Sequence, residues 1–396
     1  MASLAFSGAM IISADALSQE AASFKLGETN LTPAVRVDYV SIDNVYRKAS
    51  DEVSGTGVHV KPELVWSADR RLLTFDALYS GDYASFSEDG LDYDNHYLRL
   101  RGIGDISSRQ RFLASLSVTN FAEEQGTGQA SGVLDVLDEQ VEVTGVFGRA
   151  EYTYGARNSR GNLTGGVILG SLSYSNLEAF TDGDDYTFVR PYGVFSLRLS
   201  PDTRFLTELR FTAFDYDDDA RDRDEVALLT GVEMSASSKL SGDARIGVAK
   251  ASFDQDSDND TTELIAEVGL QYSPVSYSRF DISFDRSFET EDNNVDNIGR
   301  AIDDTAGIVW THDWSSRFQT RTTLSLDNSD RECPNVDDQT VAFEIELNYQ
   351  VRRWLQFGIS GTQESRSITD CVDTPAVLEA LDYDRSVVGA HVRATL

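Results

Sequence analysis

The chain has 396 residues, with 66 acidic side chains against 34 basic ones, which gives a net charge of -32. This acidity excludes a protein that grips nucleic acid, because phosphate binding requires clustered lysine and arginine. At 40% hydrophobic and 10% aromatic residues, the chain is too apolar for a disordered acidic polymer, so we expect it to fold. Beyond the N-terminus no segment approaches the roughly 20 apolar residues of a membrane-spanning helix. Strands in which apolar and polar residues alternate can still cross a membrane as a β-barrel.

The first sixteen residues have features of an export signal. Residues 4–12 are largely apolar, and Ala-Asp-Ala at 14–16 has the A-x-A form of a signal-peptidase site. The usual positive region is missing, because no lysine or arginine precedes Lys25. We therefore expect residues 1–16 to be a truncated signal peptide, the alternative being a short buried strand or helix. Residues 17–30 would form a short periplasmic segment, too short for a plug domain.

From residue 31 onward, apolar and polar residues alternate in one segment after another. One segment places Val58, Val60, Leu64 and Trp66 on one side and polar residues on the other. A period of two is typical of strands with one apolar face. We count eighteen such segments, an even number. They begin near residues 31, 57, 71, 91, 110, 140, 162, 185, 204, 225, 239, 262, 277, 301, 316, 339, 355 and 384.

The connections between these segments alternate strictly between short and long. Short ones include 69–70 and 314–315, whereas long ones include 121–139 and 366–384. An up-and-down barrel inserted from one side of a membrane needs tight turns on the entry side and tolerates long loops on the far side. We therefore predict an all-β fold, namely a transmembrane up-and-down antiparallel β-barrel of about 18 strands over residues 31–396, in the bacterial outer membrane.

The long connections also carry most of the excess negative charge. They contain 37 of the 66 acidic side chains and only 7 of the 34 basic ones. On an outer-membrane protein this rim would face the medium among anionic lipopolysaccharide, where divalent cations can bridge; a simply solvated surface is the alternative. Aromatic side chains near the segment ends suit the interfacial girdles of such barrels. These are Trp66, Tyr79, Tyr83, Tyr272, Tyr277, Trp310, Trp314, Tyr349 and Trp354.

No pattern of catalytic or cofactor-binding residues emerges, so we expect neither an enzyme nor a bound cofactor. The four histidines lie on different strands, without a second histidine or a cysteine at ligand spacing, which argues against a metal site. Aspartates alternate over 254–260 as at the start of a calcium loop. However, Asn259 occupies the glycine position and Ile265 that of the bidentate glutamate. At most a weak surface cation site fits.

If the apolar side of each strand faces lipid, parity turns the polar side toward the lumen. A barrel of about sixteen to eighteen strands is wide enough for an aqueous channel. Tyr97, Arg99 and Arg101 combine a ring with donors, which suits sugar hydroxyls sliding past apolar ring faces. The alternative is a solvated wall whose ion pairs only stiffen the barrel. The residues expected to line the lumen are Arg36, Asp38, Asp76, Tyr97, Arg99, Arg101, Glu208, Arg210, Glu263, Glu267, Asp281, Asp285, Arg321, Glu344, Glu346 and Arg393.

Four stretches carry a family resemblance: 31–47 (LTPAVRVDYVSIDNVYR), 62–66 (PELVW), 91–102 (LDYDNHYLRLRG) and 152–166 (YTYGARNSRGNLTGG). Together they resemble the β-barrel porins encoded with exopolysaccharide and capsule gene clusters. The resemblance implies an outer-membrane exit for polysaccharide. It also implies a separate periplasmic polysaccharide-export lipoprotein and an inner-membrane co-polymerase as partners.

We therefore expect a pore through which a capsule or biofilm polysaccharide leaves by facilitated diffusion, in contact with outer-membrane lipid and lipopolysaccharide. One alternative is a general or solute-specific diffusion porin, which should carry a long loop folded into the lumen as a constriction. Another is a structural or adhesive surface barrel, which should have much longer loops than these.

The two cysteines, Cys333 and Cys371, fall in consecutive long connections on the same rim. After export both would be in an oxidising compartment, where such a pair is normally joined. We therefore expect a disulfide between them. The alternative is two free thiols in a chain that stays in the cytoplasm.

Overall fold

The computed structural model describes residues 23–132, 137–234, 239–254, 260–288, 301–331, 336–370 and 382–395. Within these ranges the chain is almost entirely β-structure, and its few helical turns are short. None of the described helices is long and apolar enough to cross a membrane. The helical turns are η1 (Gly128–Gly132), α1 (Glu178–Thr181) and η2 (Asp219–Arg221). The strands are β1 (Phe24–Leu26), β2 (Thr29–Ile42), β3 (Gly55–Arg70), β4 (Leu73–Phe86), β5 (Tyr93–Ser107), β6 (Gln110–Glu123), β7 (Val141–Tyr154), β8 (Gly161–Tyr174), β9 (Tyr186–Arg198), β10 (Thr203–Tyr216), β11 (Arg223–Met234), β12 (Leu240–Phe253), β13 (Thr261–Val275), β14 (Ser278–Phe288), β15 (Ala301–Asp313), β16 (Phe318–Arg331), β17 (Val336–Arg352), β18 (Leu355–Asp370) and β19 (Tyr383–Thr395).

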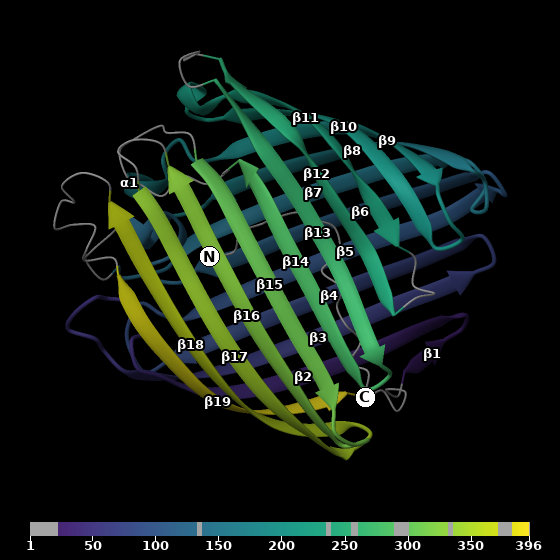
Figure 1. Ribbon diagram of the computed structural model, residues 1–396. Coiled ribbons are helices and arrows are strands. Elements are labelled where there is room, and N and C mark those ends of the chain that lie inside the picture. The colour runs from purple at the N-terminus through teal and green to yellow at the C-terminus, as the bar shows by residue number, and fades with distance from the viewer. Residues whose placement is uncertain are drawn as a thin grey trace.

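Strands β2 to β19 form a closed antiparallel barrel of eighteen strands (Figure 1). Each strand pairs with the next in sequence, and β19 returns to pair with β2, with His391 opposite Asp38. The predicted fold and strand number are confirmed. Closure leaves none of these eighteen strands with an open edge. An open edge in a membrane would expose unpaired backbone N–H and C=O groups to lipid, at a large cost in free energy.

The short strand β1 was not predicted. It pairs with the first residues of β2, with Phe24 opposite Leu31. It lies on the same edge of β2 as β19, which pairs with β2 from Ala34 onward. A tight turn joins the two strands, and Gly27 supplies the positive φ of 65° that this turn needs. Three residues are too few for an alternation pattern to be detected.

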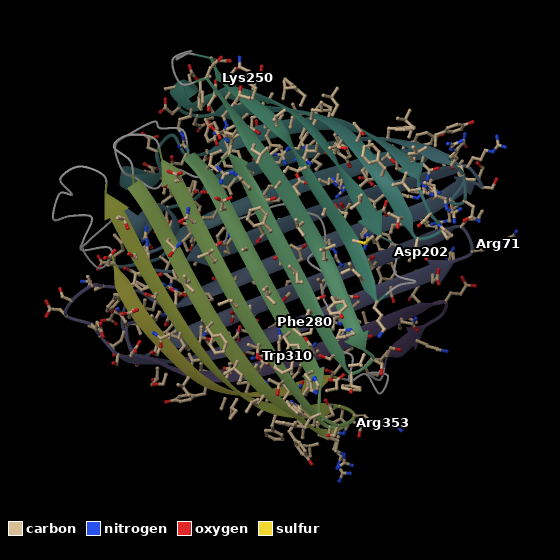
Figure 2. The ribbon with its side chains drawn as sticks, viewed as in Figure 1. Arg71, Asp202, Lys250, Phe280, Trp310 and Arg353 are labelled. Carbon is tan, nitrogen blue, oxygen red and sulfur yellow. The ribbon has the colours of Figure 1, made fainter. Side chains whose placement is uncertain are left out.

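The connections sort to the two ends of the barrel as predicted. Arg71, Asp202 and Arg353, from three short turns, lie toward the right and lower right of Figure 2, whereas Lys250, near a long connection, lies at the top. One predicted long connection, 327–338, is much shorter, because β16 and β17 continue to pair as far as Arg331 and Val336. Backbone hydrogen bonds between two strands can continue into segments whose side chains are polar on both faces. Alternation of apolar and polar residues therefore underestimates strand length.

The outer face of the barrel is apolar and the inner face is polar. Val388 is 65% exposed and Leu209 is 59% exposed, whereas Glu208, which neighbours Leu209 on the opposite face, is 3% exposed. A soluble protein would bury such a continuous apolar surface, so lipid is the solvent this face requires.

Aromatic side chains gather on the outer face near the short turns. The rings of Phe280 and Trp310 stack with centroids 6.2 Å apart (Figure 2), and those of Trp66 and Phe75 meet edge to face at 5.2 Å. Ring bodies in lipid with polar tips toward water are typical of an interfacial girdle.

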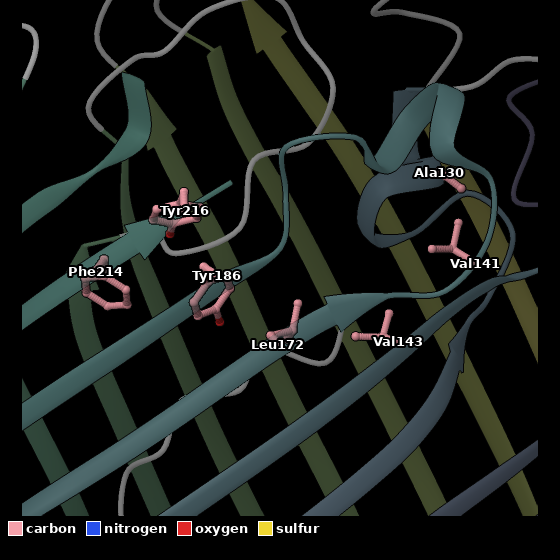
Figure 3. Packing of buried hydrophobic residues seen from close by; sticks show 7 residues of the cluster. All are labelled: Ala130, Val141, Val143, Leu172, Tyr186, Phe214 and Tyr216. Atoms are coloured by element: carbon pink, nitrogen blue, oxygen red, sulfur yellow. The ribbon is translucent and has the colours of Figure 1, made fainter. Parts of the chain in front are cut away.

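An apolar cluster lies inside the barrel at the long-connection end (Figure 3). Ala130 of η1 lies beside Val141 and Val143, and Tyr186 packs with Phe214 further along the wall. The remaining members are Leu172 and Tyr216. Because Ala130 belongs to the connection between β6 and β7, this connection turns into the barrel and does not project from it.

Candidate functional site: the lumen and its inward-folded loops

Cross-strand register places all sixteen residues expected to line the lumen on the inner face. Arg36, for example, lies opposite Lys61 on β3 and Arg393 on β19, while its neighbours Val35 and Val37 are on the exposed apolar face. The strands position these side chains simply by alternation. What alternation does not specify is which charges meet.

At the seam where the barrel closes, Arg36 is the centre of a cluster. Its guanidinium lies 2.8 Å from Asp38 and 3.2 Å from Glu346 on β17. Two strands, β18 and β19, lie between β17 and β2, so this contact crosses the concave side of the wall. His391 fits beside Arg36 because Gly358 has no side chain; a Cβ there would come within 2.2 Å of the His391 ring.

A second cluster, called here the wall cluster, consists of Glu208, Arg210, Arg245 and Glu267. Arg210 lies 2.8 Å from Glu208 and 2.7 Å from Glu267, and Arg245 lies 2.7 Å from Glu208 and 3.6 Å from Glu267. Each carboxylate is thus shared by two guanidiniums. Because β10, β12 and β13 carry these residues, the wall cluster ties together strands that the sheet already holds.

The other predicted lumen residues meet nearer partners or stand apart. Arg99 lies 3.2 Å from Asp76, and Arg393 lies 3.4 Å from Glu63. Asp281 lies 2.9 Å from Arg279. Glu263 and Asp285 each accept a hydrogen bond from a nearby hydroxyl. The same inner face also carries Tyr97 and Glu344. In the described ranges, no carboxylate lies within salt-bridge distance of Arg101 or Arg321.

A third group, called here the latch, consists of Arg47, Glu124, Glu364 and Arg385, and the sequence analysis missed all four. Arg47 lies 2.6 Å from Glu124 and 3.0 Å from Glu364, and Arg385 lies 3.1 Å from Glu124. Arg47 belongs to the connection between β2 and β3, and Glu124 to that between β6 and β7. Four strands separate β6 from β19, so the latch spans the inside of the mouth.

The described part of the connection between β6 and β7 has a defined internal structure. The side-chain amide of Gln125 donates to the carbonyl of Leu137 at 2.7 Å, and its oxygen accepts from the Leu137 amide at 3.1 Å. Gln140 donates to the carbonyl of Leu91 at 2.7 Å, which joins this connection to the one between β4 and β5. Gly128 has φ 54°, and a Cβ there would lie 2.2 Å from the carboxylate of Glu123. These contacts hold the described part of the connection on the inner side of the mouth.

Opposite charges keep the latch ionised. Arg47 and, to a smaller extent, Arg385 hold the pKa of the Glu124 carboxyl well below its ordinary value, although burial acts in the other direction. Burial alone would lower the pKa of Arg47, but the charges of Glu124 and Glu364 outweigh it and raise this pKa. Glu124 nevertheless keeps 43% of its side chain exposed, because it lies within the open lumen.

Parity assigns faces only within strands, so it could not place Arg47 or Glu124, which lie in connections. Glu364 and Arg385 lie in β18 and β19, where parity turns them inward but does not say which charges meet. One signal was available: the predicted long connections are strongly acidic, so a basic residue in one of them, such as Arg47, is unusual. The structure adds that Arg47 has φ 52°, an uncommon conformation for a residue with a long side chain.

Two expectations concern residues beyond the described ranges. Cys333 and Cys371 both lie outside them, as do residues 1–16, so the disulfide and the signal peptide stay predictions. The strands that flank the cysteines are described, and Val336 pairs with Asp370. Among the described residues, no group of three or more His, Cys, Asp or Glu side chains could hold a metal ion.

A family model described as "Putative beta-barrel porin 2" matches residues 19–396. A search of curated proteins finds no match. Among solved structures, the siderophore receptor PirA from Acinetobacter baumannii shares 6% identity at a TM-score of 0.45, with 92% of this chain and 80% of that chain covered. OpdQ from Pseudomonas aeruginosa shares 11% identity at a TM-score of 0.45, with 94% and 99% covered. OccAB4 from Acinetobacter baumannii shares 10% identity at a TM-score of 0.45, with 93% and 99% covered.

Proposed function

Because the chain belongs to this family of β-barrel porins and lies in the outer membrane, we propose that it lets a secreted polysaccharide leave the cell through its lumen. Passage is by facilitated diffusion, and the protein makes or breaks no bond of the sugar chain. The partners that follow are outer-membrane lipid and lipopolysaccharide around the barrel, and a periplasmic polysaccharide-export lipoprotein that delivers the polymer.

The observation that carries this proposal is the inner face of β5. Tyr93, Asn95, Tyr97, Arg99 and Arg101 follow one another along it, because every second residue of the strand points inward. Rings offer flat apolar surfaces to the C–H faces of sugars, while amide and guanidinium groups donate to hydroxyls. A polymer can move along such a row by exchanging one set of weak contacts for the next.

A second candidate function is that of a diffusion porin for small solutes. The inward-folded connection between β6 and β7 favours it, because this connection narrows the mouth where an extended polymer would leave. For a polysaccharide to pass, the latch must open. The third alternative, an adhesive barrel, finds less support, because this connection folds inward and does not form an exposed loop.

Deletion of the gene tests the proposal against the diffusion porin. We expect surface polysaccharide to fall while outer-membrane permeability to small solutes stays nearly unchanged. Normal polysaccharide together with reduced uptake of small solutes would establish the diffusion porin in its place.

Point variants connect this result to the lumen. Reversal of two inner-face charges, Arg99→Glu with Arg101→Glu, should reduce export more than Leu98→Gln on the outer face of the same strand. Assembly of each variant is checked by its mobility on a gel with and without boiling. Equal export from the two assembled variants would remove β5 from the pathway.

A further inference from the structure

A cavity of about 490 Å³ opens on the inner wall formed by β7 to β14. Five arginines line it, and four of them pair with carboxylates: Arg149 with Glu151, Arg286 with Asp304, and Arg210 and Arg245 within the wall cluster. Among the described residues, the fifth, Arg190, has no carboxylate within salt-bridge distance. A guanidinium without a counter-ion in a protein-lined cavity is costly to keep unless something pairs with it.

Only one nitrogen of Arg190 has a protein acceptor in the described part of the chain. Its Nε donates to the Thr212 hydroxyl at 2.9 Å, which fixes the plane of the guanidinium and leaves both terminal nitrogens without a partner. The two acids whose charges act on Arg190 are already engaged, Glu225 by Arg223 at 3.0 Å and Glu267 by Arg210 at 2.7 Å. Two parallel N–H groups are the geometry that a carboxylate accepts in bidentate fashion.

Aromatic rings lie on either side of Arg190 along β9. Phe188 and Tyr192 are two residues before and two residues after it, so all three side chains point to the inner face and line the cavity. The guanidinium carbon of Arg190 lies 5.3 Å from the centre of the Phe188 ring. Residues two apart on a strand are about 6.5 Å apart, which is on the scale of one sugar ring.

We propose that Phe188, Arg190 and Tyr192 form a subsite for an acidic sugar residue, whose carboxylate binds the two terminal nitrogens of Arg190. The ring of the sugar lies against Phe188 or Tyr192, and its hydroxyls face the open lumen. This inference rests on the proposed passage of a polysaccharide and specifies its class, a polymer that contains uronic acid residues. A half-buried subsite with a single cation suits brief occupancy during passage and not tight retention.

Binding of defined oligosaccharides to the purified full-length barrel tests the subsite. The probes are a hexamer of galacturonic acid and maltohexaose, a neutral hexamer of the same length, and the readout is block of single-channel current in a planar bilayer. We expect the acidic hexamer to block the wild-type channel at much lower concentration than maltohexaose. Arg190→Gln should weaken the acidic block about tenfold or more, because a charge-assisted pair is lost. Arg190→Lys should restore part of it, since the charge returns without the planar fork.

Arg204→Gln is the matched control. Arg204 is also on the inner face, on β10, and bonds only to Ser196 and a carbonyl in the described ranges, so the variant removes the same charge outside the cavity. Block by the acidic hexamer should be unchanged in it. Equal weakening in both variants, or equal block by both hexamers, would overturn the subsite and leave only general attraction. If gene deletion reduces polysaccharide export but the acidic hexamer does not block the channel, the subsite alone is overturned. If the acidic hexamer blocks the channel strongly but export is normal in the deletion strain, the proposed function alone is overturned.

Discussion

The latch and the wall cluster are built from the same parts, two guanidiniums that alternate with two carboxylates, yet they differ in what they join. The wall cluster connects β10, β12 and β13, which backbone hydrogen bonds already hold in register. The latch connects two connections to each other and to β18 and β19 across the mouth. Ion pairs between strands that already share backbone hydrogen bonds hardly change the position of either strand. Ion pairs between separate connections, in contrast, decide where a connection lies.

The largest effect should come from opening the latch. In the double variant Arg47→Gln with Glu124→Gln, the connection between β6 and β7 loses its ion pairs to the connection between β2 and β3 and to Arg385 on β19, and neither substituted position keeps a charge. We expect higher single-channel conductance and cleavage of this connection by external protease on the order of ten times faster.

The matched control is Arg210→Gln with Glu267→Gln, which removes a pair at a similar distance, 2.7 Å, from the wall cluster. Its loop should resist protease as the wild type does. If the two double variants are cleaved at the same rate, the latch does not hold the loop.

The second effect concerns the wall cluster and appears in stability. Glu208 is 3% exposed, and Glu208→Ala leaves Arg210 paired with Glu267, and Arg245 with Glu267 and with Asp243 at 3.0 Å. We expect a loss of about 2 kcal/mol of unfolding free energy, because two largely buried guanidiniums each lose one of their carboxylate partners. The measurement is the temperature at which the unboiled barrel converts to the unfolded band on a gel. Glu63→Ala, whose partner Arg393 is 3.4 Å away and partly exposed, should hardly change this temperature.

The pH dependence separates the two regions further. The pKa of Glu124 is lower in the folded protein than in an unfolded chain, so its contribution is complete above about pH 4.3 and disappears as the pH falls through the folded value. In a Glu123→Gln background, which removes the neighbouring buried carboxyl that accepts from the Gln129 amide, conductance should therefore stay constant from neutral pH to about pH 5 and rise only well below pH 4.3. Glu124→Gln should abolish that rise. A rise that begins near pH 6 in the Glu123→Gln background would contradict the assignment.

The smallest effect is expected from the predicted Cys333–Cys371 disulfide. Val336 and Asp370, which flank the two cysteine-containing connections, already pair, so the bond would close little additional chain. We expect it to add at most about 3 kcal/mol, and to leave both the latch and the conductance unchanged on reduction. Mass spectrometry of a non-reduced digest checks the pairing; two separately alkylated peptides with no cross-linked species would contradict it.

The sequence alone determined the parts of the structure that repeat with a local period. Alternation such as that of Val58, Val60, Leu64 and Trp66 located eighteen strands, assigned their faces and placed Arg36 and Glu208 on the same inner surface, because the pleat turns every second side chain the same way. The sorting of connections by length followed from the same count.

Only the tertiary structure decided which inner charges meet and where the loops lie. Arg36 reaches Glu346 because closure brings β17 within range of β2, and Arg47 meets Glu124 because two connections fold toward each other inside the mouth. These contacts depend on the curvature and register of the whole barrel, which no local period encodes. The same holds for Arg190, whose lack of a carboxylate partner among the described residues emerges only after its neighbours have paired with one another.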